Sequence, residues 1–184
     1  MEFVEPIKNT CHIHKIKKYL HCHSQRDFLF FVLGVNTGIR ISDLLQVRVK
    51  DVWDGEKARE FYTPAAGIEN SFYLNKVVRT ALVDYLAESS LNAEDYLFKS
   101  RKNEFPITRQ QAYRIINKAA QEAGVEGKIG THTLRKTFGY HAYKKGIAVS
   151  ILQKIFNHAT ASETLKYIGI DIYTEEPIRV DVNL

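Results

Sequence analysis

The segment His132-Thr133-Leu134-Arg135, in the last third of the chain, decides how the rest of the sequence is interpreted. Asn157-His158 and then Tyr167 follow it, and Arg40 stands far upstream. Together, these positions supply two guanidinium groups, two imidazoles and one phenol. This set suits a tyrosine oxygen that attacks a phosphodiester while arginines hold the non-bridging oxygens of the phosphate.

Each of these residues also has an ordinary structural explanation. Arg40, between two isoleucines, could be a surface or capping residue, His132 could begin a helix, and His158 could end one. Tyr167 is one of ten tyrosines, and aromatic residues at helical spacing usually belong to a core. The joint occurrence of all these residues favours the catalytic interpretation. His132 and Arg135 are one helical turn apart, so both can face the same ligand.

Three segments of the sequence resemble the tyrosine recombinase (phage integrase) family, namely residues 37–42, 132–138 and 158–167. The resemblance extends over about residues 27–170. It implies a site-specific DNA recombinase or integrase that cleaves and rejoins DNA through a 3′-phosphotyrosyl intermediate. It also implies double-stranded DNA as the partner, other protomers in a dimer or tetramer on that DNA, and neither a cofactor nor a metal. The implied catalytic residues are Arg40, His132, Arg135, His158 and Tyr167.

The sequence departs from this family at the position of the general acid. Family members carry a lysine on a β-hairpin for this purpose, whereas residues 64–71 contain no lysine. Lys57 precedes the hairpin and Lys76 begins the following helix. The departure motivates an alternative hypothesis: a catalytically weak or inactive DNA-binding protein of the same fold that acts as a regulator at recombination sites. A type IB topoisomerase-like enzyme would use the same chemistry but is usually larger.

The chain is modestly basic, with 26 Lys and Arg against 21 Asp and Glu and a formal net charge of +5. Basic residues that follow a phosphate backbone add salt-dependent affinity for DNA. Solvated helix faces and loops would explain the same charges without a nucleic-acid partner. With DNA as the partner, we expect the contacts to come from Lys99, Arg101, Lys102 and Lys136.

At 184 residues the chain fits one ordinary domain with short extensions. We expect a basic N-terminal extension over residues 1–25, a catalytic domain over 26–170 and a C-terminal tail over 171–184. The extension is too short for the family's N-terminal DNA-clamping module, so we expect a small stand-alone recombinase or a catalytic domain by itself. In the family, such tails dock on a neighbouring protomer; packing on the chain's own domain is equally open. No signal peptide or membrane-length apolar run is visible, so we expect a cytoplasmic protein.

Residues 11–14 and 21–23 bring together cysteines and histidines, which are residue types that bind zinc. The CxxC or HxxxH spacing of a structural zinc site is absent, however, and Lys15, Lys17 and Lys18 would oppose a cation. Two cysteines do not form a disulfide framework, and reduced thiols fit the cytoplasm. We therefore expect a surface helix start followed by a polar turn, and no metal.

The hydrophobic periodicity predicts an α+β fold that is mainly α, with a small three-stranded antiparallel sheet. This is the catalytic fold that the resemblance implies. We expect strands at residues 47–52, 60–63 and 71–74, and a short buried strand at 96–98. We expect helices at residues 9–19, 24–36, 76–89, 108–124, 133–145, 151–156 and 162–167, with a further helix that begins at about 41. The expected caps are Ser24, Asn75, Thr108 and Ser150, with Asn157 in the left-handed conformation.

Overall fold

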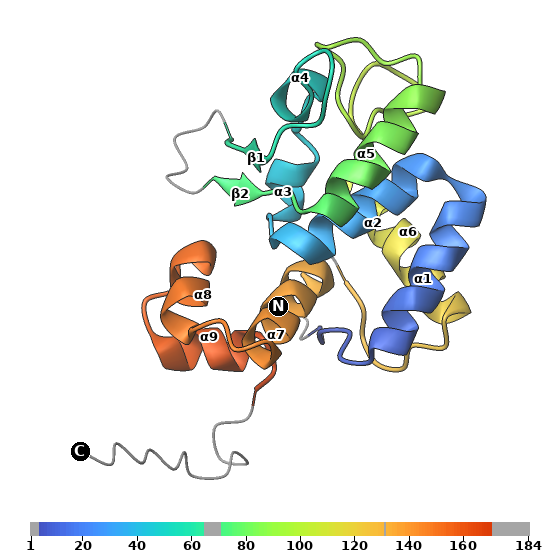
Figure 1. The fold of residues 1–184 in the computed structure, drawn as a ribbon. Helices are drawn as coiled ribbons and strands as arrows, with labels where there is room; N and C mark the ends of the chain where they lie inside the picture. The colour runs from blue at the N-terminus through green and yellow to red at the C-terminus, as the bar shows by residue number, and fades with distance from the viewer. Residues whose placement is uncertain (1–3, 65–70, 131, 171–184) are drawn as a thin grey trace.

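The computed structural model describes residues 4–64, 71–130 and 132–170. It is mainly helical with a small antiparallel sheet, as predicted. Within these ranges, none of the helices has the length and hydrophobicity that crossing a membrane requires. The elements are α1 (Thr10–His23), α2 (Gln25–Thr37), α3 (Ile41–Leu44), α4 (Val49–Val52), β1 (Phe61–Tyr62), β2 (Phe72–Tyr73), α5 (Lys76–Glu88), α6 (Arg109–Glu122), α7 (Thr133–Lys144), α8 (Val149–Phe156) and α9 (Ala161–Tyr167) (Figure 1).

Helix α2 lies at the centre of the larger hydrophobic core. Its apolar residues 29–33 are almost fully buried, and the helix packs against α1, α5 and α7. The side chain of Ser24 caps its start by accepting a hydrogen bond from the backbone N–H of Asp27. Gly38, in the left-handed conformation with φ 67°, ends it. This abrupt end fixes the point at which the chain turns into α3, and therefore the position of Arg40.

A second, smaller core joins α7, α8 and α9, which lie together apart from α5 and α6 (Figure 1). Its buried residues include Phe156 and Ile168. Gly139 of α7 allows the three helices to approach closely. A Cβ atom at this position would lie 2.5 Å from Cγ2 of Ile168 and 2.7 Å from Cζ of Phe156. The packing at Gly139 therefore holds α9, with Tyr167 at its end, against α7.

The predicted sheet is smaller than expected. Within the described residues it has two antiparallel strands, with Phe61 opposite Tyr73 and Tyr62 opposite Phe72. The predicted strand at 47–52 is wrong, because α4 occupies most of it. The carboxylate of Asp51 accepts a hydrogen bond of 2.8 Å from the backbone N–H at position 48, which caps this short helix. The two buried valines of α4 are three residues apart, a spacing that one helical turn satisfies.

Most predicted helix boundaries are confirmed, including the caps at Ser24, Asn75 and Thr108. Three details are wrong. The segment at 96–98 is not a strand: isolated bridges form only at Tyr96 and at the following Lys99. Ser150 does not cap α8, which begins at Val149. The first helix continues to His23, where a polar turn was expected.

The first helix packs as part of the larger core. Ile16 and Leu20 of α1 are buried, and the helix contacts α2 and α6. Ahead of it, the backbone N–H of Ile7 donates a hydrogen bond of 2.9 Å to the hydroxyl of Thr137 in α7. The proposed domain limits at 25 and 170 stay a prediction. The tail at 171–184 lies outside the described residues.

Replacing Gly139 with alanine should destabilise the protein by about 1–3 kcal/mol, because the added Cβ overpacks the contact between α7, α8 and α9. Urea unfolding would measure the loss. Gly34→Ala is the matched control, since Gly34 is also helical and its added Cβ would meet the end of the Leu134 side chain. Both variants gain about 1 kcal/mol of helix propensity, so the difference between them reports the clashes, and the loss should be smaller at Gly34, where the added Cβ meets one side chain and not two. An equal loss in both variants would contradict the proposed importance of the Gly139 contact.

Candidate active site

A cavity of about 300 Å³ opens between the α2–α3 junction, the first turns of α6 and α7, and the α8–α9 pair. All five residues that the sequence nominated as catalytic line it. Two further polar side chains and an arginine that the sequence analysis did not nominate join them. Among the described residues, no carboxylate lines this cavity. The lining residues are Arg40, Ile41, Ser42, Arg109, His132, Arg135, Phe156, Asn157, His158 and Tyr167.

Arg135 is the most enclosed cation of the cavity, with only 7% of its surface exposed. Its guanidinium donates hydrogen bonds to the backbone carbonyls of Gly38 and, at 3.0 Å, Ile155. It also lies over the ring of Phe156, with Cζ 4.7 Å from the ring centre. Burial lowers the pKa of Arg135, but an arginine side chain stays protonated at neutral pH. The structure therefore presents a fixed positive charge at this wall.

Arg40 occupies the N-cap position of α3 with extended backbone angles (φ −65°, ψ 140°). Its neighbours Ile39 and Ile41 are buried and anchor the backbone, while the Arg40 side chain is exposed. The positive charge of Arg40 acts on other residues of the cavity, and it lowers the pKa of Tyr167 and of His158. A cation anchored at its backbone and open at its guanidinium is free to meet an anionic ligand.

His132 and His158 are both uncharged for most molecules at neutral pH. Burial lowers the pKa of His132, and the nearby charges of Lys136, Arg135 and Arg109 lower it further. Burial also lowers the pKa of His158, against an opposing effect of Glu163. His132 immediately precedes α7, and the residue is exposed at the N-terminal end of this helix.

The position of His158 depends on Asn157. This residue ends α8 in the left-handed conformation with φ 55°, as predicted, and the chain reverses there. Nδ1 of His158 then lies 3.0 Å from the hydroxyl oxygen of Thr164 in α9. One ring nitrogen is thereby engaged, and the other remains available to the cavity.

Tyr167 is the last residue of α9, and its ring packs against two aromatic neighbours. The ring centres of His158 and Phe156 lie 5.0 Å and 5.3 Å from that of Tyr167. Burial raises the pKa of the phenol, while the charges of Arg135 and Arg40 act in the opposite direction. The net shift is upward, so the phenol is neutral at pH 7.

Lys136, predicted as a DNA contact, lies inside the protein and is only 7% exposed. Its Nζ donates a hydrogen bond of 2.8 Å to the carbonyl of Val4 and lies 5.2 Å from the centre of the Tyr167 ring. Burial lowers its pKa. The structure thus places Lys136 beneath Tyr167, apart from the basic residues at 99–102.

Arg109, the first residue of α6, lines the cavity but was missed by the sequence analysis. A capping box fixes its backbone: the Thr108 hydroxyl accepts from the N–H of Gln111, and the Gln111 side chain accepts from the N–H of Thr108. The sequence did identify Thr108 as a cap. It carried no signal that this helix start faces the same space as Arg40, 69 positions earlier in the chain.

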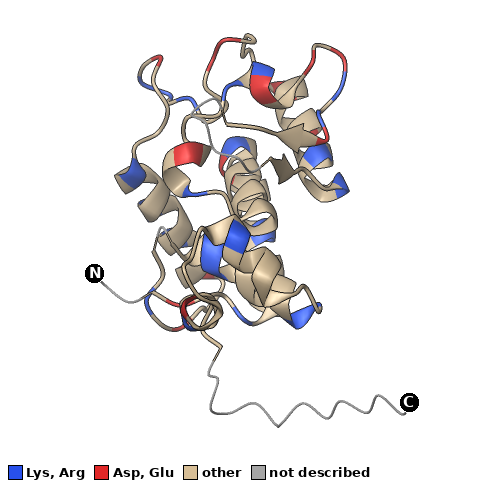
Figure 2. Ribbon diagram, turned by 90° about the vertical axis from the view of Figure 1, so that its left-hand side faces the viewer, with Lys and Arg blue, Asp and Glu red and all other residues tan. Residues whose placement is uncertain are grey.

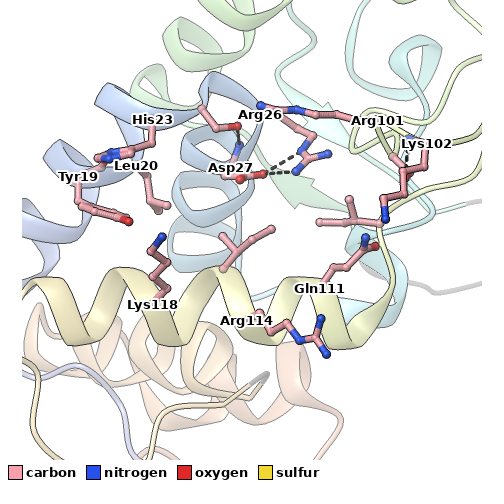
Figure 3. A pocket seen from close by; sticks show the side chains of 14 residues that line it. Tyr19, Leu20, His23, Arg26, Asp27, Arg101, Lys102, Gln111, Arg114 and Lys118 are labelled. Atoms are coloured by element: carbon pink, nitrogen blue, oxygen red, sulfur yellow. Dashed lines mark hydrogen bonds and ion pairs between the residues drawn. The ribbon is translucent and has the colours of Figure 1, made fainter.

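A second cavity, of about 420 Å³, lies between α1, the start of α2, α6 and the loop at 99–107 (Figure 3). Arg101 and Lys102 line one end, and Arg114 and Lys118 approach from α6. Lys99 differs from these four residues. It pairs with Glu104 and, at 3.0 Å, with Asp95, so its charge is locally compensated. Lys and Arg are spread over several helices and loops of the molecule (Figure 2).

The cysteines and histidines of α1 lie on one continuous helix. Cys11 and Cys22 are both exposed, and eleven residues of helix separate them by about 16 Å. His14 and His23 each hydrogen-bond to a backbone carbonyl of their own helix at 2.7 Å. In the described part of the chain, no three His, Cys, Asp or Glu side chains are grouped as metal ligands.

Comparison with solved structures finds the same fold in recombinases. The crystal structure of XerA recombinase matches with a TM-score of 0.76 and 20% identity, covering 94% of this chain and 62% of that chain. A lambda integrase dimer bound to a COC′ core site matches with a TM-score of 0.67 and 18% identity, covering 99% of this chain and 65% of the other. At these identities the similarity establishes the fold alone.

Sequence relatives give a closer match. The probable integrase/recombinase YoeC of Bacillus subtilis (strain 168) is 40% identical over 173 residues, which cover 93% of this chain and 92% of that protein. Tyrosine recombinase XerA of Pyrococcus furiosus is 27% identical over 147 residues, 79% of this chain but only 50% of the relative. This chain thus spans nearly all of YoeC and about half of the XerA sequence. The phage integrase family model matches residues 6–172, and the chain therefore belongs to the phage integrase family.

Proposed function

We propose that this chain is a site-specific DNA recombinase or integrase that breaks and rejoins DNA with Tyr167 as its nucleophile. The observation that carries the proposal is the convergence of five nominated side chains on one cavity of about 300 Å³. Those side chains come from segments up to 127 positions apart, from 40 to 167. Packing alone does not require two arginines, two histidines and a tyrosine to face one open space without a carboxylate.

In the proposed reaction, Oη of Tyr167 attacks the phosphorus of a DNA phosphodiester in line with the 5′-oxygen. The bond from Oη to phosphorus forms and the bond from phosphorus to the 5′-oxygen breaks, leaving a 3′-phosphotyrosyl link and a 5′-hydroxyl. Arg40 and Arg135 neutralise the charge that develops on the non-bridging oxygens, and His132 lies close enough to Arg135 to assist. Attack by a second 5′-hydroxyl reverses the step. The covalent link conserves the bond energy, so the reaction needs no nucleotide cofactor.

Three arginines line this cavity, and their guanidinium groups differ in what they already bind. Arg135 uses N–H groups on two backbone carbonyls. Arg40 and Arg109 are exposed, and each can offer its planar fork to a phosphate. We therefore assign Arg109 to phosphate binding beside the two arginines that the sequence predicted.

The partner in this proposal is double-stranded DNA, held by Arg109 at the catalytic cavity and by Arg101 and Lys102 at the second cavity. Lys99 contributes less, because Asp95 and Glu104 already compensate its charge. Strand exchange requires two duplexes, so other protomers act with this chain in a dimer or tetramer on the DNA. A recombinase works where DNA is held, and a cytoplasmic location is part of the same proposal.

A second candidate function is a DNA-binding regulator of the same fold that does not cleave. One observation favours it: residues 64–71 contain no lysine, the side chain that serves as general acid on this hairpin in the family the sequence resembles. The two candidates share the fold and the DNA partner. They differ in whether a covalent bond to DNA ever forms.

Covalent capture separates the two functions. The 184-residue chain would be incubated with a library of nicked duplexes of randomised sequence, and protein-linked DNA recovered under denaturing conditions and sequenced. We expect a defined set of linked sequences from the unsubstituted chain. Tyr167→Phe should abolish the adduct and leave DNA binding nearly unchanged, because it removes only the attacking oxygen.

Tyr113→Phe is the matched control, since Tyr113 is an exposed tyrosine of α6 outside the cavity. This variant should keep the adduct. An adduct that persists in Tyr167→Phe would refute the nucleophile assignment. Binding of DNA without any adduct from the unsubstituted chain would favour the regulator.

Salt dependence tests the proposed DNA contacts. Arg101→Ala and Lys102→Ala should each weaken duplex binding and reduce the slope of log affinity against log salt by about 1, because each removes one phosphate contact. Lys99→Ala should change the slope less, since its ammonium already pairs with two carboxylates. Titrations at several salt concentrations would measure the slopes. Equal slope changes in all three variants would contradict this division of roles.

A further inference from the structure

Thr164 is a buried residue of α9, three positions before Tyr167, that the reaction described above does not use. It is 0% exposed. Its hydroxyl oxygen lies 3.3 Å from the carbonyl oxygen of Thr160 and 3.0 Å from Nδ1 of His158. A carbonyl oxygen can only accept, so the hydroxyl donates its single hydrogen to Thr160. The arrangement that satisfies both contacts then has Nδ1 of His158 donating to the Thr164 oxygen.

This arrangement fixes the tautomer of His158. In a neutral imidazole, one ring nitrogen carries the hydrogen and the other is an acceptor. With the hydrogen on Nδ1, the lone pair is on Nε2, the nitrogen that Thr164 leaves free. Neutral His158 can therefore accept a proton through Nε2 but cannot donate one to a phosphate.

On the cavity side, the His158 ring contacts the ring of Tyr167. The two rings meet nearly at right angles, with centres 5.0 Å apart and 71° between their planes. The phenol is neutral at pH 7, so it must give up its proton as it attacks. No carboxylate among the described lining residues can take that proton, and the remaining base of the cavity, His132, makes no ring contact with Tyr167.

We propose that Thr164 is a positioning residue that sets the tautomer of His158, and that Nε2 of His158 accepts the phenolic proton when Tyr167 attacks the phosphate. The inference rests on the proposed function, since it needs Tyr167 to be the nucleophile. The charged groups around His158 agree with a neutral resting state. Arg135 of α7 and Arg40 before α3 lower its pKa, in addition to burial, and only Glu163 of α9 raises it.

The proton leaves Oη of Tyr167 for Nε2 of His158 while Oη bonds to phosphorus, and the electron pair of the broken bond goes to the 5′-oxygen. The 5′-oxygen takes a proton from water. The imidazolium returns its proton to solvent, so cleavage neither consumes nor releases protons overall. During its lifetime the imidazolium can donate from Nε2 to a phosphate oxygen.

The tautomer can be measured directly and without DNA. In nitrogen-labelled protein at pH 8, the NMR signals of His158 should show a protonated Nδ1 and an unprotonated Nε2. Thr164→Val removes the hydroxyl at nearly constant volume and should shift His158 toward the other tautomer. Thr164→Ser keeps the hydroxyl and should restore the original pattern. A protonated Nε2 in the unsubstituted chain at this pH would overturn the assignment.

The kinetic consequence is measured as the single-turnover rate of adduct formation on a captured duplex. In the unsubstituted chain the rate should rise with pH through the lowered pKa of His158 and then level off, because the base must be deprotonated. His158→Gln should slow the reaction by about 100-fold or more and remove that rise. Thr164→Val should slow it about tenfold, and Thr164→Ser should recover most of the loss.

The possible outcomes separate failure of this inference from failure of the proposed function on which it rests. If the unsubstituted chain forms no adduct, the proposed function fails, whereas the NMR measurement still decides the tautomer. If the adduct forms and His158→Gln leaves both its rate and its pH profile unchanged, His158 is not the base. If Thr164→Val and Thr164→Ser slow the reaction equally while both remain folded by urea unfolding, Thr164 acts only through packing.

Discussion

The site depends above all on the buried guanidinium of Arg135. Its hydrogen bonds to the carbonyls of Gly38 and Ile155 join the end of α2 to the end of α8 across α7. These are the two turns that carry Arg40 and His158. A buried charge is stable only when it is paired or hydrogen-bonded. The need to satisfy one arginine therefore brings three segments of the proposed active site together, and the same side chain faces the proposed phosphate.

Local chemistry explains why much of the fold could be predicted from the sequence. Ser24 and Thr108 cap helices through bonds that span three residues, and Asn157 reverses the chain through its own backbone conformation. The strand prediction at residues 47–52 was wrong because the spacing of its valines fits both the period of a strand and the period of a helix. Apolar residues at 47, 49 and 52 alternate in part like a strand, yet 49 and 52 also share a helical face. The carboxylate of Asp51 favours the helix, because it accepts a hydrogen bond from the backbone N–H that precedes the helix.

The site was predictable as a set of residues but not as an arrangement. Arg109 and Lys136 are both basic residues in the first turn of a helix, and nothing in their local sequence separates them. The start of α6 points Arg109 into the cavity. The N-terminal segment instead covers the start of α7, so that Lys136 bonds to the carbonyl of Val4 and lies under Tyr167. Such differences arise from the packing of distant segments, which sequence periodicity does not encode.

Different residues of the cavity are suited to charge stabilisation and to proton transfer. Three arginines supply permanent positive charge, which suits a pentacoordinate phosphate, but guanidinium groups do not exchange protons at neutral pH. Both histidines are held neutral by burial and by those same arginines. A neutral imidazole beside a neutral phenol is arranged to accept a proton and not to donate one. In the proposed reaction these groups serve the attack by tyrosine, and none of the described residues that line the cavity is arranged to protonate the leaving oxygen.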